Sequence, residues 1–327
     1  MILVTGATGF IGRSLVRELS TAGHPLRVLL RPSRRSPRLP RGVPVEVAVV
    51  SLADPRGLRA ALNDVKIIFH LAGAEWQGRH ANLTATDVEG TRNLVEAAVD
   101  AGVQRFIYLS HLGASRQSSF PVLQAKGEAE EHIRRSSLSH TILRSAIVYG
   151  PDDHFTTGLA RLLRMAPAVF FIPGGGRTVL QPFWVEDLVA CLLWTLDNPD
   201  SLNRVYELGG SEYFTVRQIL EILMPIIHAR RTLVELPIPL LRSLTVLLEN
   251  TIPGFPASSF WVDYAFVSRT CPADSTSRAF GLMPARFTYR LDYLAYKPWW
   301  RRLSETYSAR REEALERLRE RFPRLPG

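Results

Sequence analysis

Residues 2–12 read ILVTGATGFIG, a short apolar run that leads directly into a glycine-rich turn. Ile2 to Thr5 has the composition of a buried strand, and Phe10 to Leu19 has apolar residues at helical spacing. A G-x-x-G-x-x-G pattern between a strand and a helix is the context in which glycines predict a dinucleotide site. The opening of the chain therefore predicts a loop that binds the diphosphate of a dinucleotide.

The three glycines of this loop have separate expected roles. Gly6 permits a tight turn, Gly9 lets the backbone approach the diphosphate, and Gly12 allows the helix to pack closely on the sheet. The amino terminus of the helix offers backbone N–H groups to the phosphates. Thr8, Phe10 and Ile11 are expected to contact the coenzyme from the same loop.

Strand-like and helix-like segments then alternate as far as Tyr149, which predicts an α/β fold with a doubly wound parallel sheet of Rossmann type. The expected strands are Leu26–Leu30, Val45–Val50, Lys66–Leu71, Arg105–Ser110, Thr141–Val148 and Arg204–Leu208. The expected helices lie near 14–21, 55–62, 90–101, 125–135 and 185–196. We expect a coenzyme-binding core at 1–150, a smaller substrate-side lobe at 151–296 in which 236–255 forms broken amphipathic segments, and a basic amphipathic helix at 297–327.

Composition limits the classes of function. The apolar fraction of 46% and the charged fraction of 22% are those of a globular protein. Cys191 and Cys271 are interpreted as buried apolar residues, and His70 and His111 as packed strand-end residues, because none of them has partners at metal-ligand spacing. No metal site is expected.

The start of the chain and its charge bear on location and partners. Gly6 and Gly9 interrupt the first apolar run before it reaches the length of a signal peptide, which favours a cytoplasmic protein. No apolar run is long enough to span a bilayer, and peripheral membrane contact stays open. The net charge of +9 is compatible with nucleic acid, but no nucleic-acid motif accompanies it, so nucleic acid is not expected as a partner.

Arginines decide between the two nicotinamide coenzymes. An NAD site normally has Asp or Glu at the end of the second strand, where it binds the ribose hydroxyls. Arg31 occupies that place, and Arg34 and Arg35 follow, so positive charge lies where a 2′-phosphate would bind. NADP(H) is therefore favoured, and NAD(H) is the alternative. Arg38 and Arg41 are interpreted as solvated loop charges.

Five segments together resemble the short-chain dehydrogenase/reductase superfamily, in its extended and atypical members. SHLGAS at 110–115 followed by AKGEAE at 125–130 is similar to the branch that contains the nucleotide-binding accessory subunit of respiratory complex I. The resemblance implies coenzyme contacts from the stretch after the fourth strand, Leu71, Ala72 and Gly73, and from Ser51 and Leu52 in place of a common Asp. The five segments are TGATGFIG at 5–12, HLAG at 70–73, GTRNLVEAA at 90–98, RFIYLS at 105–110 and VYGP at 148–151.

The resemblance also names catalytic candidates, and one position departs from the family pattern. Active members carry a Tyr four residues before a Lys, with a Ser at a strand end, and the Tyr transfers a proton. Lys126 and Ser110 match the Lys and Ser, and both are also predicted to contact the coenzyme, but Val122 stands where the Tyr belongs. Ser118 and Ser119 lie too far before Lys126 to substitute directly, and Tyr149 is a weaker replacement because the VYGP turn is usually structural.

The carboxyl-terminal segment carries its own signal. Residues 297–302 (KPWWRR) place two tryptophans beside three cations, and 307–322 follows with Leu315, Leu318 and Phe322 on one helical stripe. Such a helix can lie on an anionic membrane surface or dock on a protein complex. An ordinary surface helix with Glu–Arg pairs four residues apart fits the same pattern.

Two hypotheses of function follow. The first is a catalytically quiet NADP(H)-binding protein with a structural or complex-associated role, which Val122 favours. The alternative is an active NADP(H)-dependent oxidoreductase or epimerase on a small apolar or sugar-nucleotide substrate, because hydride transfer is carried by the coenzyme and does not itself need the Tyr.

Overall fold

A seven-stranded parallel sheet forms the centre of the computed structural model, which describes residues 1–33, 39–75, 81–252 and 267–295. The strand order is β11-β6-β5-β4-β1-β2-β3, and every neighbouring pair is parallel. The predicted fold class is therefore confirmed. The strands are β1 (Ile2–Thr5), β2 (Leu26–Leu30), β3 (Glu46–Val49), β4 (Ile67–His70), β5 (Arg105–His111), β6 (His140–Ser145) and β11 (Arg204–Leu208).

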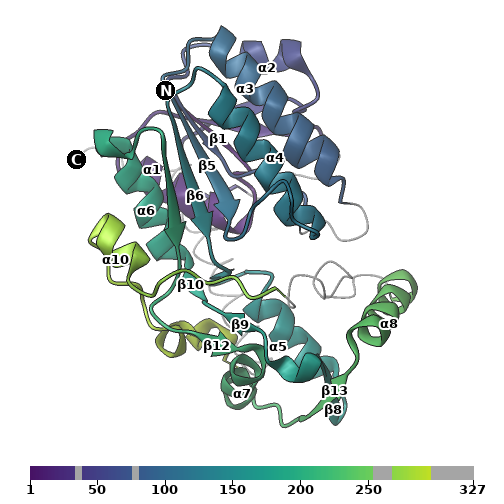
Figure 1. Ribbon diagram of the computed structural model, residues 1–327. Coiled ribbons are helices and arrows are strands. Elements are labelled where there is room, and N and C mark those ends of the chain that lie inside the picture. Colours follow the sequence, from purple (N-terminus) through teal and green to yellow (C-terminus); the bar gives the residue numbers. More distant parts are fainter. Residues whose placement is uncertain (34–38, 76–80, 253–266, 296–327) are drawn as a thin grey trace, which may run out of the picture.

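Helices cover both faces of this sheet (Figure 1). α1 (Phe10–Thr21) and α6 (Val185–Asp197) pack together on one face. α2 (Pro55–Ala61), α3 (Gly90–Asp100) and α4 (Pro121–Arg135) form the layer on the other. Alternate residues of β1 serve the two layers: Leu3 packs with the α2–α4 side and Val4 with the α1–α6 side, and both are fully buried.

The strand order reverses at β1, and we call the carboxyl edge of the sheet at this reversal the crevice. The chain runs outward from β1 through β2 to β3, and then returns to β4 on the other side of β1. Ligands of doubly wound folds bind beyond the strand ends at such a reversal. The register pairs Thr5 at the end of β1 with His70 at the end of β4, so the segments that follow these residues face each other across the crevice.

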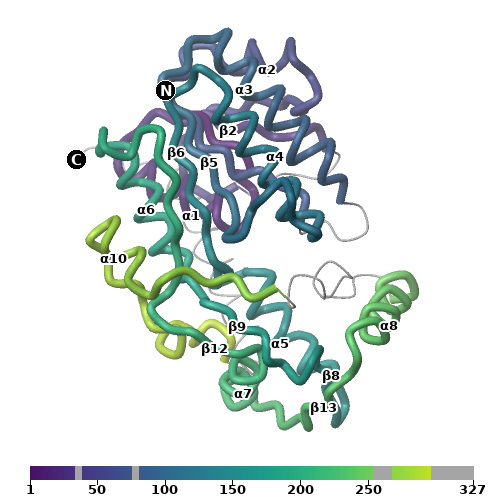
Figure 2. The backbone as a smooth tube through the Cα atoms, viewed as in Figure 1, coloured from purple at the N-terminus to yellow at the C-terminus, as the bar shows by residue number. Residues whose placement is uncertain are grey.

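A smaller lobe is built from residues beyond β6, and it has a hydrophobic cluster of its own. The chain does not stay in this lobe, because α6 and β11 return to the main sheet before the lobe resumes (Figure 2). Its elements are β7 (Val148–Tyr149), α5 (Thr156–Met165), β8 (Val169–Pro173), β9 (Val179–Leu180), β10 (Phe183–Trp184), β12 (Phe214–Thr215), α7 (Val216–Ile226), β13 (Thr232–Leu236) and α8 (Ile238–Thr251). Helix α10 (Ser275–Phe280) packs instead against β11 of the main sheet. Short 3-10 turns occupy Gly174–Gly176, Pro199–Ser201, Phe287–Arg290 and Asp292–Leu294.

The apolar stretch 141–148 was expected to be one strand, and that expectation is wrong. β6 ends at Ser145, and β7 begins at Val148 and pairs with β10 in the smaller lobe. The Ala146 N–H donates to the Leu208 carbonyl at 2.7 Å, so the chain completes its pairing with β11 before it turns into the second sheet. Hydrophobicity is similar on both sides of this break, and for that reason the pattern does not reveal it.

The second difference is α8, where broken segments were expected. The helix runs without interruption from Ile238 to Thr251, with Pro237 as its amino-terminal cap residue and a proline in its first turn. Proline is tolerated there because the first N–H groups of a helix have no partner within it. In the part of the chain that the structure describes, no helix is long and apolar enough to cross a membrane.

Candidate functional site

The glycine loop has the geometry of a phosphate-binding turn. Gly6 has φ +70°, and a Cβ there would lie 2.7 Å from the Leu71 carbonyl. A Cβ on Gly12 would overlap the Gly6 carbonyl, so both glycines have the turn and packing roles expected of them. Gly9 is exposed and caps α1 without a side-chain bond, which leaves the first N–H groups of the helix for a phosphate.

Other residues of the loop join it to its surroundings. The Thr8 carbonyl accepts a hydrogen bond from Arg13 Nη1 at 3.2 Å, and Arg13 also lies 3.4 Å from Asp152. The Phe10 ring approaches Gly150, where an added Cβ would come within 3.0 Å of it. Phe10 and Ile11 are half-buried. Loop, helix and the start of the smaller lobe therefore form one wall of the crevice.

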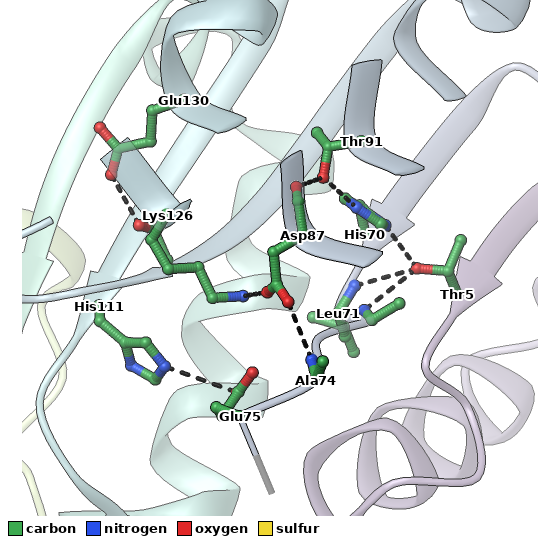
Figure 3. Close-up of polar contacts among 12 residues, drawn as sticks. Thr5, His70, Leu71, Ala74, Glu75, Asp87, Thr91, His111, Lys126 and Glu130 are labelled. Atoms are coloured by element: carbon green, nitrogen blue, oxygen red, sulfur yellow. Dashed lines mark hydrogen bonds and ion pairs between the residues drawn. The ribbon is translucent and has the colours of Figure 1, made fainter. Parts of the chain in front are cut away.

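Thr5 joins the two sides of the crevice through hydrogen bonds (Figure 3). Its Oγ1 accepts from the N–H groups of Leu71 and Ala72, each at 3.2 Å, and pairs with His70 Nδ1 at 2.7 Å. Because Thr5 already accepts twice, its hydroxyl donates to Nδ1. His70 Nε2 then donates to Thr91 Oγ1 at 2.9 Å, and the Thr91 hydroxyl donates to the Asp87 carbonyl at 2.5 Å.

His70 is a packed strand-end residue, as expected. Burial, and then the Lys126 charge, lower its pKa to about 3, so the ring is neutral near pH 7 and keeps the tautomer that its partners require. The chain of bonds fixes Leu71 and Ala72 opposite the glycine loop. The predicted coenzyme contacts on the two strand ends are thereby brought together.

The adenosine end of the predicted site is only partly described. Arg31 follows β2 directly and is exposed, while Arg34 and Arg35 lie outside the described residues. Ser51 Oγ accepts from the Ala53 N–H at 3.2 Å. Leu52 packs on Gly90, and its carbonyl accepts a hydrogen bond from Asn93 at 2.9 Å. Both candidate adenine contacts, Ser51 and Leu52, are therefore held in place just after the end of β3.

A buried group of charges lies around Lys126 (Figure 3). The Lys126 Nζ is 3.0 Å from Asp87 Oδ1, and the two residues are 3% and 1% exposed. The other Asp87 oxygen accepts from the Ala74 N–H at 3.0 Å. Glu75 folds back over Gly73, where an added Cβ would overlap its carboxylate, and its Oε1 lies 3.5 Å from His111 Nε2. We call Lys126, Asp87, Glu75 and His111 the Lys126 cluster.

Charge balance determines the protonation of the cluster. Burial lowers the pKa of Lys126, but Tyr108 and the two carboxylates outweigh it, so the pKa lies well above its ordinary value and Lys126 stays charged. Burial alone would raise the pKa of Glu75, yet Lys126 and His111 hold it below its usual range. Burial and the charge of Glu75 raise the pKa of Asp87 despite Lys126. One ammonium group thus stabilises one carboxylate fully and the other in part.

Ser110 is turned toward a different set of partners. Its hydroxyl donates to Glu130 Oε1 at 2.6 Å, and the residue is fully buried. Arg144 binds the same carboxylate through Nε at 2.9 Å and Nη2 at 2.7 Å. The structure therefore binds the Ser110 hydroxyl to the Glu130 carboxylate, which forms an ion pair with Arg144 between α4 and β6. The catalytic role of Ser110 stays a prediction.

The residues considered as a source of protons are also placed. Val122 lies one turn before Lys126 and is 5% exposed, so the expected Tyr position carries an apolar side chain. Tyr149 is fully buried among the rings of Trp184 and Phe287 in the smaller lobe. The Ser118 Oγ accepts a hydrogen bond from the Phe120 N–H at 3.2 Å in the turn before α4.

Three members of the Lys126 cluster were missed as site residues. Asp87 lies in the π-helical turn Thr84–Glu89, which has no periodic signature of its own and turns this carboxylate inward. Glu75 follows the predicted contact Gly73 by two residues, and His111 follows the candidate Ser110 by one. Carboxylate and imidazole groups so close to predicted contacts were the signal that could have found them.

Comparisons with known proteins agree with this geometry. A family model described as NAD(P)H-binding matches residues 6–163. The alpha subcomplex subunit 9 of mitochondrial NADH dehydrogenase (ubiquinone) from Arabidopsis thaliana is 31% identical over 273 residues, which cover 78% of this chain and 65% of that protein. Ceramide reductase from Caulobacter vibrioides is 28% identical over 312 residues, covering 91% of this chain and 96% of that protein.

A solved structure shares the fold. UDP-glucose 4-epimerase from Thermotoga maritima superposes with a TM-score of 0.67 at 22% identity, over 90% of this chain and 96% of the epimerase. The chain spans less than two thirds of the length of the mitochondrial subunits that it matches.

The glycine loop, the crevice and the buried lysine all fit a nicotinamide dinucleotide. The matches confirm the predicted resemblance to NAD(P)H-binding proteins of the atypical short-chain dehydrogenase/reductase type. Its coenzyme is NAD(P)(H). The loop would hold the diphosphate, and Leu71 to Gly73 would line the path from there toward Lys126.

Proposed function

We propose that this protein is an oxidoreductase that uses NADP(H) to reduce a carbonyl group on an apolar substrate. The Lys126 cluster carries the proposal, because it places charge at the carboxyl edge of the sheet, at the end of the predicted coenzyme path. Within the described residues, Glu75 Oε2 and the Tyr108 hydroxyl are buried without a hydrogen-bond partner. Unsatisfied polar atoms cost stability, and such atoms gather at functional sites.

The chain's own residues have separate tasks in this proposal. The bound coenzyme supplies the hydride. The glycine loop and the N–H groups at the start of α1 bind the diphosphate, and Leu71 to Gly73 orient the nicotinamide half. The Lys126 ammonium group provides positive charge beside the reacting carbonyl, where negative charge develops on oxygen.

One relative supports the type of reaction. Ceramide reductase matches this chain over almost the full length of both, and its name describes a reductase. The test is NADPH oxidation by the purified protein with aldehydes, quinones, long-chain ketones and sugar nucleotides in turn. Reproducible turnover with a member of this panel supports the proposal, and its absence across the panel refutes it.

NADPH is proposed as the preferred reductant because Arg31 stands at the end of β2. We expect Arg31→Asp combined with Arg34→Ala to weaken NADPH binding tenfold or more while NADH binding changes little, since a charge-assisted phosphate contact contributes about 1.5–3 kcal/mol. Arg17→Asp is the control, because Arg17 lies on the exposed face of α1 and this substitution matches the charge change of Arg31→Asp alone. Calorimetric titration with both coenzymes measures the effect. Equal losses for NADPH and NADH would contradict the assignment.

A catalytically quiet, structural role is the second candidate. Val122 cannot exchange a proton, and the Ser110 hydroxyl is taken up by Glu130. In that case the coenzyme would act by stabilising the fold, and the purified protein should retain it through extensive dialysis. Absorbance of the dialysed protein at the nicotinamide band distinguishes this candidate when it is combined with the turnover assay.

Association with a membrane surface or a protein complex through the helix expected at 297–327 stays a prediction, because that segment lies outside the described residues. A cytoplasmic location also stays a prediction. The matched mitochondrial protein is by its name a subunit of NADH dehydrogenase. Copurification of this chain with and without residues 297–327 would test the prediction.

A further inference from the structure

The proposed reduction needs a proton as well as a hydride, and the position that supplies it in active family members is occupied by Val122. A proton carrier must therefore come from elsewhere in the site. His111 is the last residue of β5 and lies near Lys126. Histidine is the side chain that most often acts as a general acid. Its Nε2 faces the Glu75 carboxylate at 3.5 Å, and Glu75 in turn borders Gly73 on the coenzyme path.

Two features distinguish this pair from an incidental surface contact. Both side chains are largely buried, with 15% and 13% of their area exposed, so their charges act in a low dielectric. Glu75 faces His111 (Figure 3), and the nearby Lys126 charge helps to hold the pKa of the Glu75 carboxyl group below its usual range. A histidine oriented by a carboxylate is the arrangement that general acid–base catalysis uses.

We propose that His111 exchanges the substrate proton and that Glu75 positions its ring, a proposal that rests on the oxidoreductase function above. Reduction moves a hydride from C4 of the reduced nicotinamide to the carbonyl carbon, while the carbonyl oxygen takes the proton from Nδ1 of the His111 imidazolium, whose Nε2 faces Glu75. The products are the alcohol, the oxidised coenzyme and neutral His111, which solvent reprotonates. Oxidation of the alcohol runs the same steps backwards, with neutral His111 accepting the hydroxyl proton.

The proposal predicts opposite pH dependences for the two directions. Burial lowers the pKa of His111 below 6.5, Glu75 opposes that effect, and Lys126 and Arg269 add to it. Reduction needs the imidazolium, so its kcat falls as pH rises through this lowered pKa. Oxidation needs neutral imidazole, so its kcat rises through the same pH. A shared midpoint with opposite signs is a signature that a merely structural histidine would not give.

The experiment compares His111→Gln, Glu75→Gln and the control His132→Gln, at a half-buried residue of α4 outside the Lys126 cluster, in the full-length chain. We expect His111→Gln to lose at least a hundredfold in kcat together with its pH dependence, because general acid catalysis contributes about 10²–10⁴-fold. Glu75→Gln should keep part of the activity and move the midpoint to lower pH, since the imidazolium loses its anion. His132→Gln should behave as the unaltered protein does.

NADPH titration shows whether a variant is folded and binds coenzyme, and if His111→Gln does not fold, the two-direction pH profiles of the unaltered protein and of Glu75→Gln still decide. Turnover that survives in His111→Gln, or profiles that run in the same direction, overturns this proposal and leaves the oxidoreductase function standing. Failure of the unaltered protein to turn over any substrate overturns both.

Discussion

Replacing Lys126 by Met removes the ammonium group from a buried space that also holds the carboxylates of Asp87 and Glu75. Met matches the length of the Lys stem, so the packing changes little and the charge is what is lost. Asp87 keeps its bond from the Ala74 N–H, but both carboxylates lose the cation that faces them. Removal of one partner from a buried ion pair costs about 3–5 kcal/mol, because the remaining charge is uncompensated.

This loss corresponds to a measurable shift in melting temperature. The entropy of unfolding is about 2.1 cal/mol/K per residue, which gives roughly 0.7 kcal/mol/K for 327 residues that unfold together. A loss of 3–5 kcal/mol then lowers Tm by about 4–7 °C. Asp87→Asn should cost less, about 1–3 kcal/mol, because the amide oxygen still accepts from Ala74 and Lys126 keeps Glu75 as its partner.

The pH dependence provides a second check on the same variant. Without Lys126, both carboxyl groups have pKa values raised above their ordinary 3.8 and 4.5 by burial, so the folded state binds protons more tightly than the unfolded state. Stability then falls as pH rises from those ordinary values through the raised ones. The deficit of Lys126→Met relative to the unaltered protein is therefore large at pH 7.5 and shrinks toward pH 4.

Urea unfolding followed by tryptophan fluorescence measures these quantities at both pH values. Combining Lys126→Met with Asp87→Asn closes a double-mutant cycle. If the cost comes from an uncompensated carboxylate, the double variant is more stable than the sum of the two single losses predicts. Strictly additive losses, or a deficit that does not change between pH 7.5 and pH 4, would refute the electrostatic account.

The remaining predictions concern the crevice and the opposite edge of the sheet, where the strands begin. Gly12→Ala should abolish coenzyme binding in calorimetry, because its Cβ would overlap the Gly6 carbonyl. Thr5→Val should lower the free energy of unfolding by about 1–3 kcal/mol, whereas Thr21→Val on the exposed end of α1 should cost little. Arg105→Met should destabilise by about 2–4 kcal/mol in urea unfolding, since Arg105 donates to the carbonyls of Leu196 and Asn198. An unchanged urea unfolding midpoint for Thr5→Val or for Arg105→Met would contradict the hydrogen bonds assigned to that residue.

The features that the sequence predicted are those carried by neighbouring residues. The glycines at 6, 9 and 12 predict the loop because each of these positions has a local structural reason for a glycine. The alternation of strand-like and helix-like apolar segments predicts a doubly wound sheet. The expected bounds of the strand Leu26–Leu30 agree with the structure at both ends. Lys126 was found because the family pattern fixes its distance from other motifs along the chain.

The features that escaped prediction depend on residues brought together by folding. Asp87 meets Lys126 across 39 positions of sequence, and only the packing of the π-helical turn against α4 brings them within 3.0 Å. The Ser110 hydroxyl is diverted by Glu130, a residue that reads as an ordinary charged position on a helix surface. Neither contact has a local signature, because helical periodicity describes which face is apolar and not which polar group the other face meets.

A continuous series of contacts links the start of the chain with its buried lysine. Thr5 at the end of β1 bonds to His70, His70 to Thr91, Thr91 to the backbone of Asp87, and the Asp87 side chain to Lys126. The first of these residues precedes the diphosphate loop, and the last stands where the proposed reaction occurs. Because these contacts are consecutive, we expect the two halves of the proposed coenzyme site to be positioned together. The geometry that positions the diphosphate thereby also positions the charge at the other end.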